Sequence, residues 1–406
     1  MKAKQIYSLL NDINAQMWGE DAVDVYDASG IVSLGNAVLS SQTDTDAFLN
    51  ALVDRIGKTI IRTLDLELDF PTLFMNEFEF GAILQKITVN PFDAIANSAW
   101  EVGENGFTPT ILDVNKPSVT VKMFKGATTW RFAVTIPDDL FMSAFTDAGS
   151  MGNFITAITS AMNDSMVMSI NNMSRTAINN FIAEKFKNDN GCINVLEAYN
   201  TIFSDNALTE AEAMVSKEFY RFATNYIRKY ITYLSQPSKL YNVDGTLRVT
   251  ARDNMHVLML TDFVAGFDSY LSSDSFHNDV LGMPLYSEVA YWQGNLGEDD
   301  DSNDIINDFS INSSINIVPS SEESEADPTK RTAINKGGII CVLADRQAVA
   351  VGINRRRAGA FYNSIDGYEN IKSDATIQWI NDLGENGIIF YMEDTREPEP
   401  TPDPGD

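Results

Sequence analysis

Apolar residues recur with a helical period near the start of this chain and then switch to the period of a strand. A first helical pattern comprises Ile6, Leu9, Leu10, Ile13 and Met17. A second follows the polar residues 43–45 and comprises Phe48, Leu49, Leu52 and Ile56. Residues 64–70 then alternate strictly between apolar and acidic side chains, which predicts a strand with one apolar and one acidic face.

Residues 78–136 have the character of β-structure. Residues 83–89 and 119–124 are candidate strands, and the long stretch 90–117 between them includes the turn sequence Gly-Glu-Asn-Gly at 103–106. A loop of this length inside a compact domain is unusual and tends to be functional. The two strands and their loop therefore predict a projecting β-arm.

The period becomes helical again over residues 152–187. The apolar positions are Ile155, Ile158, Met162, Met166, Ile170, Met173, Ala177 and Phe181. Such a helix is roughly 50 Å long at 1.5 Å per residue. Few charged residues interrupt it, so we expect neighbouring elements or other chains to cover it.

A further helix is expected from Thr209, where Glu212 completes a capping box, to Pro237. It carries an aromatic stripe at helical spacing: Phe219, Phe222, Tyr226, Tyr230 and Tyr233. That stripe indicates a helix face that is buried in the protein core or in a subunit interface. Stacking of nucleic-acid bases on the rings is the alternative. Residues 255–260 predict an apolar strand, and Thr261-Asp262 predicts the N-cap of a short helix to about Leu271.

The last part of the chain reads as strands. One opens at residues 282–286, residues 338–345 and 348–353 are expected to pair, and residues 375–381 and 388–392 are expected to form a hairpin. The Gly-Glu-Asn-Gly sequence at 384–387 supplies the Asn-Gly turn of that hairpin.

Composition places the chain among folded soluble proteins. It has 406 residues, of which 44% are apolar, and a formal net charge of −28. The length predicts two or three domains. No transmembrane run or secretory leader is apparent, so we expect synthesis and retention in the cytoplasm of the cell that makes it. Cys192 and Cys341 lie far apart in the sequence, so free thiols are expected.

The negative charge is concentrated in two stretches. Residues 298–327 hold ten acids and no Lys or Arg, which predicts a long solvated surface loop, with loose divalent-cation binding as the lesser alternative. Residues 393–406 hold six acids, and every second residue from 398 to 404 is a proline, which predicts an extended polyproline-type tail. The overall charge disfavours nucleic acids and anionic membranes as binding partners.

Sequence motifs for catalysis are absent. The phosphate loop, the dinucleotide glycine fingerprint and the nucleophile elbow do not occur, and His256 and His277 lack metal-ligand spacing. The acidic pair Asp138-Asp139 follows a proline and favours a helix cap over acid–base chemistry. We therefore expect no enzyme, no cofactor and no metal site.

Arg355-Arg356-Arg357 is the basic cluster that stands out in this acidic chain. Ion pairing within or between subunits is the favoured interpretation, and contact with a nucleic-acid backbone is the alternative.

The order of these elements resembles the Hong Kong ninety-seven fold of tailed-bacteriophage major capsid proteins. Residues 52–57 with 59–62 look like the segment that enters the fold in the phi-twenty-nine-like short-tailed (podovirus) group. The return to the long helix is similar in Pro117, Val119, Phe124, Phe132, Ile136, Asp138, Asp139, Ala144 and Phe145. The run 257–271 followed by Gly282-x-Pro284-Leu285 is typical of the family's axial domain.

The resemblance implies an α+β fold and a domain plan. The plan assigns 1–62 to an N-terminal arm and 63–208 to a peripheral domain, with the extended loop at 78–136 and the spine helix at 152–187. It assigns 209–352 to an axial domain with the acidic insertion 298–327, 353–392 to peripheral return strands, and 393–406 to the tail.

The resemblance also implies a structural function, the major capsid protein of a double-stranded DNA phage that self-assembles into an icosahedral or prolate head. Implied partners are copies of itself in hexamers and pentamers, a scaffolding protein, a portal protein and the enclosed DNA. Its place would be the virion, assembled in the host bacterial cytoplasm. Interface candidates are Arg355, Arg356, Arg357, Phe107 and Trp100. The alternatives are an encapsulin-like nanocompartment shell and an acidic hydrolase.

Overall fold

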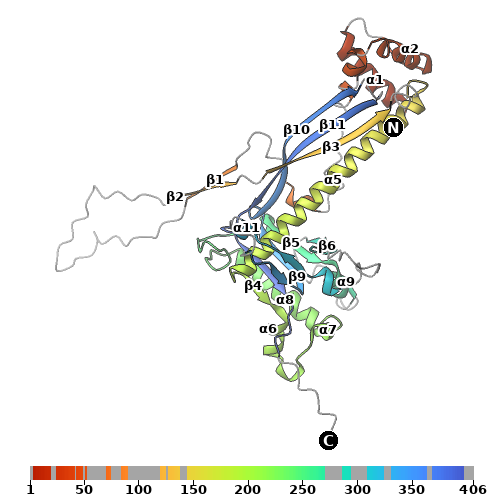
Figure 1. The fold of residues 1–406 in the computed structure, drawn as a ribbon. Helices are drawn as coiled ribbons and strands as arrows, with labels where there is room; N and C mark the ends of the chain where they lie inside the picture. The colour runs from red at the N-terminus through yellow and green to blue at the C-terminus, as the bar shows by residue number, and fades with distance from the viewer. Residues whose placement is uncertain are drawn as a thin grey trace, which may run out of the picture. The chain divides into compact units, whose positions relative to one another are not determined.

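The chain folds into two compact units, each assembled from separate parts of the sequence (Figure 1). The computed structural model describes residues 3–19, 24–41, 43–48, 51–52, 70–74, 84–89, 119–124, 127–137, 144–269, 286–293, 309–323, 331–363 and 368–396. Unit 1 combines residues 1–82, 126–176 and 350–379. Unit 2 combines residues 83–125, 177–349 and 380–406.

Helices build the N-terminal part of unit 1. The first predicted helix is confirmed as α1, Ala3–Trp18, and residues 43–48 confirm the start of the second helical pattern. Sequence reasoning missed α2, Ala28–Val38, which is N-capped by Asp27 through a 2.8 Å hydrogen bond from the Gly30 N–H. The signal that was missed is Asp27, a good N-cap residue, followed by the apolar positions Ile31, Leu34 and Val38 at spacings of three and four residues.

The sheet of unit 1 has three strands in the order β10-β11-β3, namely Val349–Asn363, Tyr368–Asn381 and Ala127–Pro137 (Figure 1). β11 and β3 are antiparallel, and Thr376 lies opposite Thr129. This pairing corrects the expectation that residues 375–381 form a hairpin with 388–392. The expected pairing of residues 338–345 with 348–353 is also wrong, because these strands belong to two different sheets. Strands adjacent in sequence were assumed to pair, which holds for most but not all neighbours.

The predicted long helix is confirmed as α5, Ala148–Lys187, which has 40 residues. It begins four residues earlier than expected, because the Asp147 carboxylate accepts a 2.9 Å hydrogen bond from the Ser150 N–H. That bond, with a second from Gly149, lowers the pKa of Asp147.

Unit 2 contains a five-stranded mixed sheet in the order β4-β12-β9-β5-β6. Its strands are Cys192–Asn194, Gly387–Tyr391, Ile339–Asp345, Met255–Leu260 and Ser287–Val289. Every residue of β5 and β9 is buried, as the continuous apolar sequences of these strands indicate. The predicted strand 255–260 is therefore confirmed. Of the strands expected at 64–70 and 282–286, only Phe70 and Tyr286 lie within the described residues.

The predicted helix 209–237 is in fact two helices. The capping box of Thr209 and Glu212 is confirmed, but it starts only the short α7, Glu210–Ala213. Ser216 then caps α8, Lys217–Leu234, by accepting a hydrogen bond from the Phe219 N–H. Ser216 lies within a run of apolar residues at helical spacing, so the sequence analysis treated it as an ordinary helical residue and not as a cap. α8 packs on α6, Val195–Ile202, through rings of Tyr199 and Phe219 whose centroids are 5.7 Å apart.

The N-cap expected at Thr261-Asp262 is wrong. The helix exists as α9, Thr261–Phe267, but its N-cap is Leu260, which makes no side-chain capping bond. The Asp262 carboxylate instead accepts a 3.1 Å hydrogen bond from the Asn312 amide. A long-range partner thus outweighs the local capping geometry.

The acidic insertion is not simply a solvated loop. Its described part forms α10, Phe309–Asn312, β7, Ile315–Ile317, and α11, Ser320–Glu323, and β7 pairs with β8, Ile334–Lys336. The buried Glu184 of α5 anchors α11, because its carboxylate accepts hydrogen bonds from both the N–H and the hydroxyl of Ser321 at 2.8 and 2.9 Å. The many acids give this stretch the composition of a disordered segment, but Ile315 in its described part is buried.

Gly338 joins β8 to β9 and is a position where only glycine fits. Its φ is +72°, and a Cβ would lie 1.9 Å from the backbone oxygen of Met392. We expect Gly338→Ala to destabilise the subunit by about 3 kcal/mol or more, because backbone strain and a clash with backbone add together.

The measurement is urea unfolding followed by circular dichroism. Gly337→Ala is the matched control, because its Cβ would meet only the Ser314 hydroxyl, at 3.1 Å. Equal unfolding midpoints for the two variants would contradict the strain argument.

Candidate functional site

β1, Leu84–Val89, and β2, Val119–Phe124, form a two-stranded antiparallel ribbon in unit 2 (Figure 1). This ribbon confirms the two strands that were predicted to flank the long loop. Ile87 lies opposite Val121, and Lys86 lies opposite Lys122. Side chains alternate between faces along a strand, so these two pairs mark opposite faces of the ribbon.

One face of the ribbon is apolar and exposed. Its exposed side chains are Ile87, Val89, Val119, Val121 and Met123, at 62%, 56%, 50%, 48% and 60% of their maximal accessible surface. Single exposed apolar residues are common, but five on one face form a contiguous apolar patch. Such a patch indicates a surface that another protein surface covers.

The other face holds a cross-strand pair of like charges. Lys86 and Lys122 lie directly opposite each other, an arrangement that is destabilising in isolation. The carboxylate of Asp382 compensates for it, since one oxygen lies 2.8 Å from the Lys86 ammonium and the other 2.7 Å from the Lys122 ammonium. One buried acid thus holds one lysine from each strand.

Further charges complete this lysine–aspartate cluster, which comprises Lys86, Lys122, Asp244, Arg248, Asp382 and Glu385. Glu385 lies 2.7 Å from Lys86 and 3.2 Å from Arg248, and Asp244 pairs with Lys122. Gly384 makes this approach possible, because a Cβ there would lie 2.3 Å from both Asp244 and Lys122. The cluster fixes the base of the ribbon to unit 2.

Asp382 is held ready to accept these contacts. The residue is 2% exposed, its N–H donates to the Ala348 carbonyl at 2.7 Å, and its Oδ1 accepts from the Gly384 N–H at 3.0 Å. Burial opposes its charge, but the hydrogen bonds and charges of Lys122 and Lys86 outweigh burial and lower the pKa of Asp382 below 3.8. The carboxylate is therefore ionised at neutral pH.

The predicted arginine cluster lies on β10, within unit 1. The Arg357 side chain is exposed, whereas the side chains of Arg355 and Arg356 lie outside the described residues. Asp374 on β11 receives a two-pronged ion pair from Arg131 on β3, at 2.7 and 3.0 Å. That pair mainly lowers the pKa of Asp374, and the charge of Arg357 adds to the effect. Arg357 thus lies near an acid of its own sheet.

Several other sequence candidates fall outside the described residues, namely Trp100, Phe107, Asp138, Asp139 and His277. His256 is buried on β5, where burial and the charge of Arg346 lower its pKa to about 4, so it is neutral and structural. Cys192 and Cys341 are free thiols, as predicted. Burial raises the pKa of Cys192 to about 12, which disfavours the reactive thiolate.

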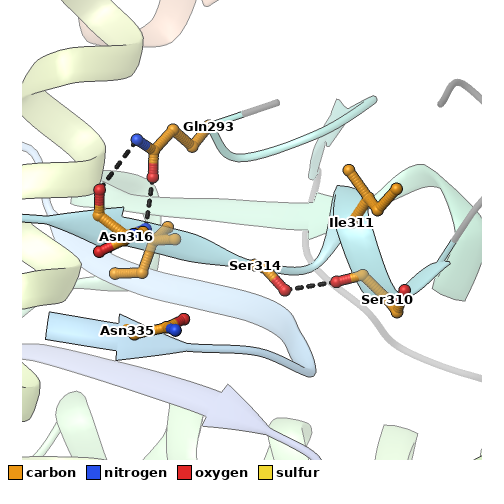
Figure 2. Close-up of a pocket in the computed structure, with 7 residues that line it drawn as sticks. Gln293, Ser310, Ile311, Ser314, Asn316 and Asn335 are labelled. Carbon is orange, nitrogen blue, oxygen red and sulfur yellow. Dashed lines mark hydrogen bonds between the residues drawn. The ribbon is translucent and has the colours of Figure 1, made fainter. Parts of the chain in front are cut away.

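Figure 2 shows a pocket of about 330 Å³ in unit 2. Its lining residues are Gln293, Ser310, Ile311, Ser314, Ile315, Asn316 and Asn335. None of these side chains is ionisable at neutral pH, and the Gln293 amide is already bonded to the Asn316 backbone. The pocket therefore lacks a general acid, a general base and an activated nucleophile.

Chemical groups for metal binding or membrane insertion are also missing from the described part of the chain. Among those residues, His, Cys, Asp and Glu nowhere gather in a group of three suited to a metal ion. None of the helices within them has the length and apolar content needed to span a bilayer.

Sequence reasoning missed the lysine–aspartate cluster. Asp382 is 296 residues from Lys86 and 260 from Lys122, so no local spacing connects them. The available signal was weak: both lysines interrupt predicted β-strands at positions facing away from the apolar residues. Two lysines on one face of a predicted ribbon require an acid, but the sequence does not say which one.

Known proteins similar to this chain are phage capsid proteins. Residues 10–391 match the family described as Phi29-like phage major capsid protein. The major capsid protein of Bacillus phage B103 is 24% identical over 187 residues, which cover 46% of this chain and 39% of that protein. The major capsid protein of Bacillus phage PZA is 21% identical over 258 residues, which cover 63% of this chain and 53% of that protein. The chain thus spans about half the length of these relatives, or less.

Similar solved structures include the capsid of Staphylococcus phage Andhra and the capsid of Cyanophage P-SCSP1u. The first has a TM-score of 0.49 and 10% sequence identity, and covers 79% of this chain and 83% of that chain. The second has a TM-score of 0.43 and 10% identity, and covers 80% of this chain and 87% of that chain.

Proposed function

This chain belongs to the Phi29-like phage major capsid protein family, and from that premise we propose that it is the repeating shell subunit of a tailed, double-stranded DNA bacteriophage head. The observation that carries the proposal beyond membership is the β1–β2 ribbon. Its apolar face is exposed in the isolated subunit while its opposite face is fixed by buried charge. A rigid base with an uncovered apolar face suits contact with another subunit.

The partner that fits this face is a second copy of the chain. Shell subunits need large, shape-matched contacts, typically thousands of Å² for permanent assemblies. Symmetry then repeats each contact around closed rings, here hexamers and pentamers. The ribbon and the loop it carries supply such area more readily than a compact domain does.

We extend the proposal to the other members of the assembly. A scaffolding protein and a portal protein would act during head formation in the host bacterial cytoplasm, and the finished subunit would reside in the virion. Double-stranded DNA would be enclosed with little binding, because a subunit with a net charge of −28 repels a phosphate backbone.

The domain plan and the sequence candidates for interfaces also remain proposals. We assign 78–136 to the extended loop and 209–352 to the axial domain that meets neighbours near the symmetry axes. Trp100 and Phe107, on the loop, and Arg355, Arg356 and Arg357, on β10, are the proposed interface residues.

A charge on the apolar face of the ribbon is expected to prevent shell assembly. In Val121→Glu, each contact would bury a carboxylate without a partner, which costs several kcal/mol per subunit. Negative-stain electron microscopy of the purified protein, expressed alone and with a candidate scaffold, should show closed particles for the natural sequence and dispersed subunits for the variant.

Thr120→Glu is the matched control, because Thr120 neighbours Val121 but lies on the opposite face of the ribbon. It should assemble normally, and circular dichroism should be the same for both variants. Closed particles from Val121→Glu would refute the assembly role of this face. Particle contents distinguish the two shell hypotheses, since nucleic acid indicates a phage head and protein cargo a nanocompartment.

A further inference from the structure

A side chain closes the outer edge of β7. Among the described residues, β7 pairs with β8 alone, and Asn316 lies opposite Asn335. The Gln293 amide nitrogen donates to the Asn316 carbonyl at 3.0 Å, and the Gln293 amide oxygen accepts from the Asn316 N–H (Figure 2). The N–H and C=O of one strand residue point to the same side of the strand. The Gln293 amide therefore occupies the side of β7 that faces away from β8.

The Gln293 amide makes the contacts that a residue of an added strand would make. In an antiparallel pair, two residues at a hydrogen-bonded position exchange two N–H···O bonds. Gln293 exchanges the same two bonds with Asn316, using its side-chain carboxamide instead of backbone groups. A carboxamide has the chemistry of a peptide group. The group that binds this edge in the structure thus identifies the class of ligand that fits it, an extended polypeptide.

Neither a charge nor a proline protects the edge of β7. Charged side chains and prolines commonly prevent a strand edge from pairing with another chain. Residues 309–321 contain no charged residue, and β7 itself contains no proline. Asn316 and Gln293 are both exposed, so another chain can reach them. Apart from the shortness of β7, the Gln293 amide is the protection that the described residues provide.

The partner that this edge fits is the same edge of a second copy. Two identical strands can pair antiparallel across a two-fold axis, so that one surface is complementary to itself. With Asn316 on the axis, it would lie opposite Asn316 of the partner subunit, and Ile315 opposite Ile317 of the partner subunit. The uncharged stretch 309–321 brings no like charges into this contact, although each subunit has a net charge of −28.

We propose that the outer edge of β7 is an acceptor site for β7 of a second copy, and that the Gln293 amide keeps this site closed in the free subunit. Pairing requires each copy to exchange its Gln293 amide for the backbone of the other. The exchange of one set of hydrogen bonds for another brings little net gain, so free subunits stay apart at this edge. The inference concerns two subunits and does not depend on shell formation.

A fluorescent peptide of residues 313–319 tests the acceptor site on the full-length chain. Fluorescence anisotropy should show that the peptide binds Gln293→Ala about tenfold more tightly than the natural sequence, because no side chain competes for Asn316. Gln236→Ala removes another exposed glutamine of unit 2 and should bind the peptide as the natural sequence does. The same peptide with a methyl group on the backbone nitrogen of Asn316 should not bind.

Two outcomes of the peptide experiment would overturn the proposal. Absence of binding to Gln293→Ala, or equal binding to this variant and the natural sequence, would show that Gln293 closes no acceptor site. Equal binding of the methylated peptide would show that side chains, and not backbone pairing, hold the peptide. Circular dichroism should be the same for all the proteins.

Sedimentation velocity tests the partner. Gln293→Ala should form a dimer about a hundredfold more tightly than the natural sequence, since both edges are opened, and moderate salt screens the repulsion between subunits. Shells sediment far faster than a dimer, so shell formation is read separately. A Gln293→Ala chain that stays monomeric at every concentration would overturn the choice of a second copy.

A second substitution tests the two-fold geometry. Asn316→Asp in the Gln293→Ala chain should abolish the dimer, because two carboxylates would face each other on the axis. Asn335→Asp in the same chain is the matched control, because Asn335 is also exposed but lies on β8, away from the axis. It should leave the dimer intact. Equal loss of the dimer with both substitutions would overturn the pairing through β7.

Discussion

A chain that lacks residues 92–114 is expected to fold into a soluble subunit that cannot close into shells. The deletion leaves β1 and β2 complete, together with the lysine–aspartate cluster that fixes them to unit 2. It removes the loop to which the proposed function assigns contact with a neighbouring copy. Because large contact area holds a shell together, the loss should affect assembly far more than folding.

Circular dichroism and thermal unfolding report the fold of this variant, and negative-stain electron microscopy reports shells. A Gly/Ser segment of the same length in place of residues 92–114 is the matched control for loop closure. It should also fail to form shells, since it restores length without the side chains. Normal shells from the deletion variant would contradict the assignment of the arm.

Replacing Asp382 with alanine is expected to release the base of the ribbon. Lys86 and Lys122 would then oppose each other across the strands with no carboxylate between them. Hydrogen bonds to charged groups contribute about 1.5–3 kcal/mol each, and the two lysines are partly exposed, so we expect a loss of about 2 kcal/mol of unfolding free energy. Shell yield should fall further than this stability loss alone explains, because the ribbon loses its fixed orientation.

Urea unfolding gives the stability change, and hydrogen exchange at residues 84–89 and 119–124 reports the ribbon itself. Asp374→Ala is the control, because it breaks an ion pair between β11 and β3 that is exposed at Arg131. If the ribbon amides exchange hydrogen equally slowly in both variants, Asp382 does not fix the ribbon.

The same contact predicts a pH dependence. The pKa of Asp382 is lower in the folded state than its ordinary value of 3.8, so the unfolded chain binds the proton more readily. The contribution of Asp382 to the unfolding free energy is therefore complete at pH values above its pKa in the unfolded chain. It is lost as the pH falls through its pKa in the folded protein. Wild-type stability should decline more steeply than that of Asp382→Ala over this acidic range.

Elements with a strong local pattern were predicted well. The 40-residue α5, the buried strand β5 and the strands β1 and β2 all follow from periodicity alone, because each buries or exposes whole faces. The capping box at Thr209 was also recognisable, because its two partners are three residues apart. The resemblance to phage capsid proteins rested on the order of such elements, and the family match over residues 10–391 confirms it.

Errors arose where a long-range partner replaced a local one. Residues 375–381 and 388–392 have the sequence of a hairpin, yet β11 pairs with β3 and β12 pairs with β9 and β4. Asp262 resembles a cap but bonds to Asn312. In each case the partner lies far away in the sequence, and the tertiary contact overrides the local turn or cap preference.

Composition and spacings of two to four residues were sufficient to predict the family, the α+β class, the long helix and the acidic character of this protein. The folded structure was needed to show which strands share a sheet, that part of the acidic insertion is anchored on Glu184, and that Asp382 joins the two lysines of the ribbon. Those features depend on groups far apart in the sequence, up to 296 residues for Asp382 and Lys86, which come within hydrogen-bonding distance only when the chain has folded.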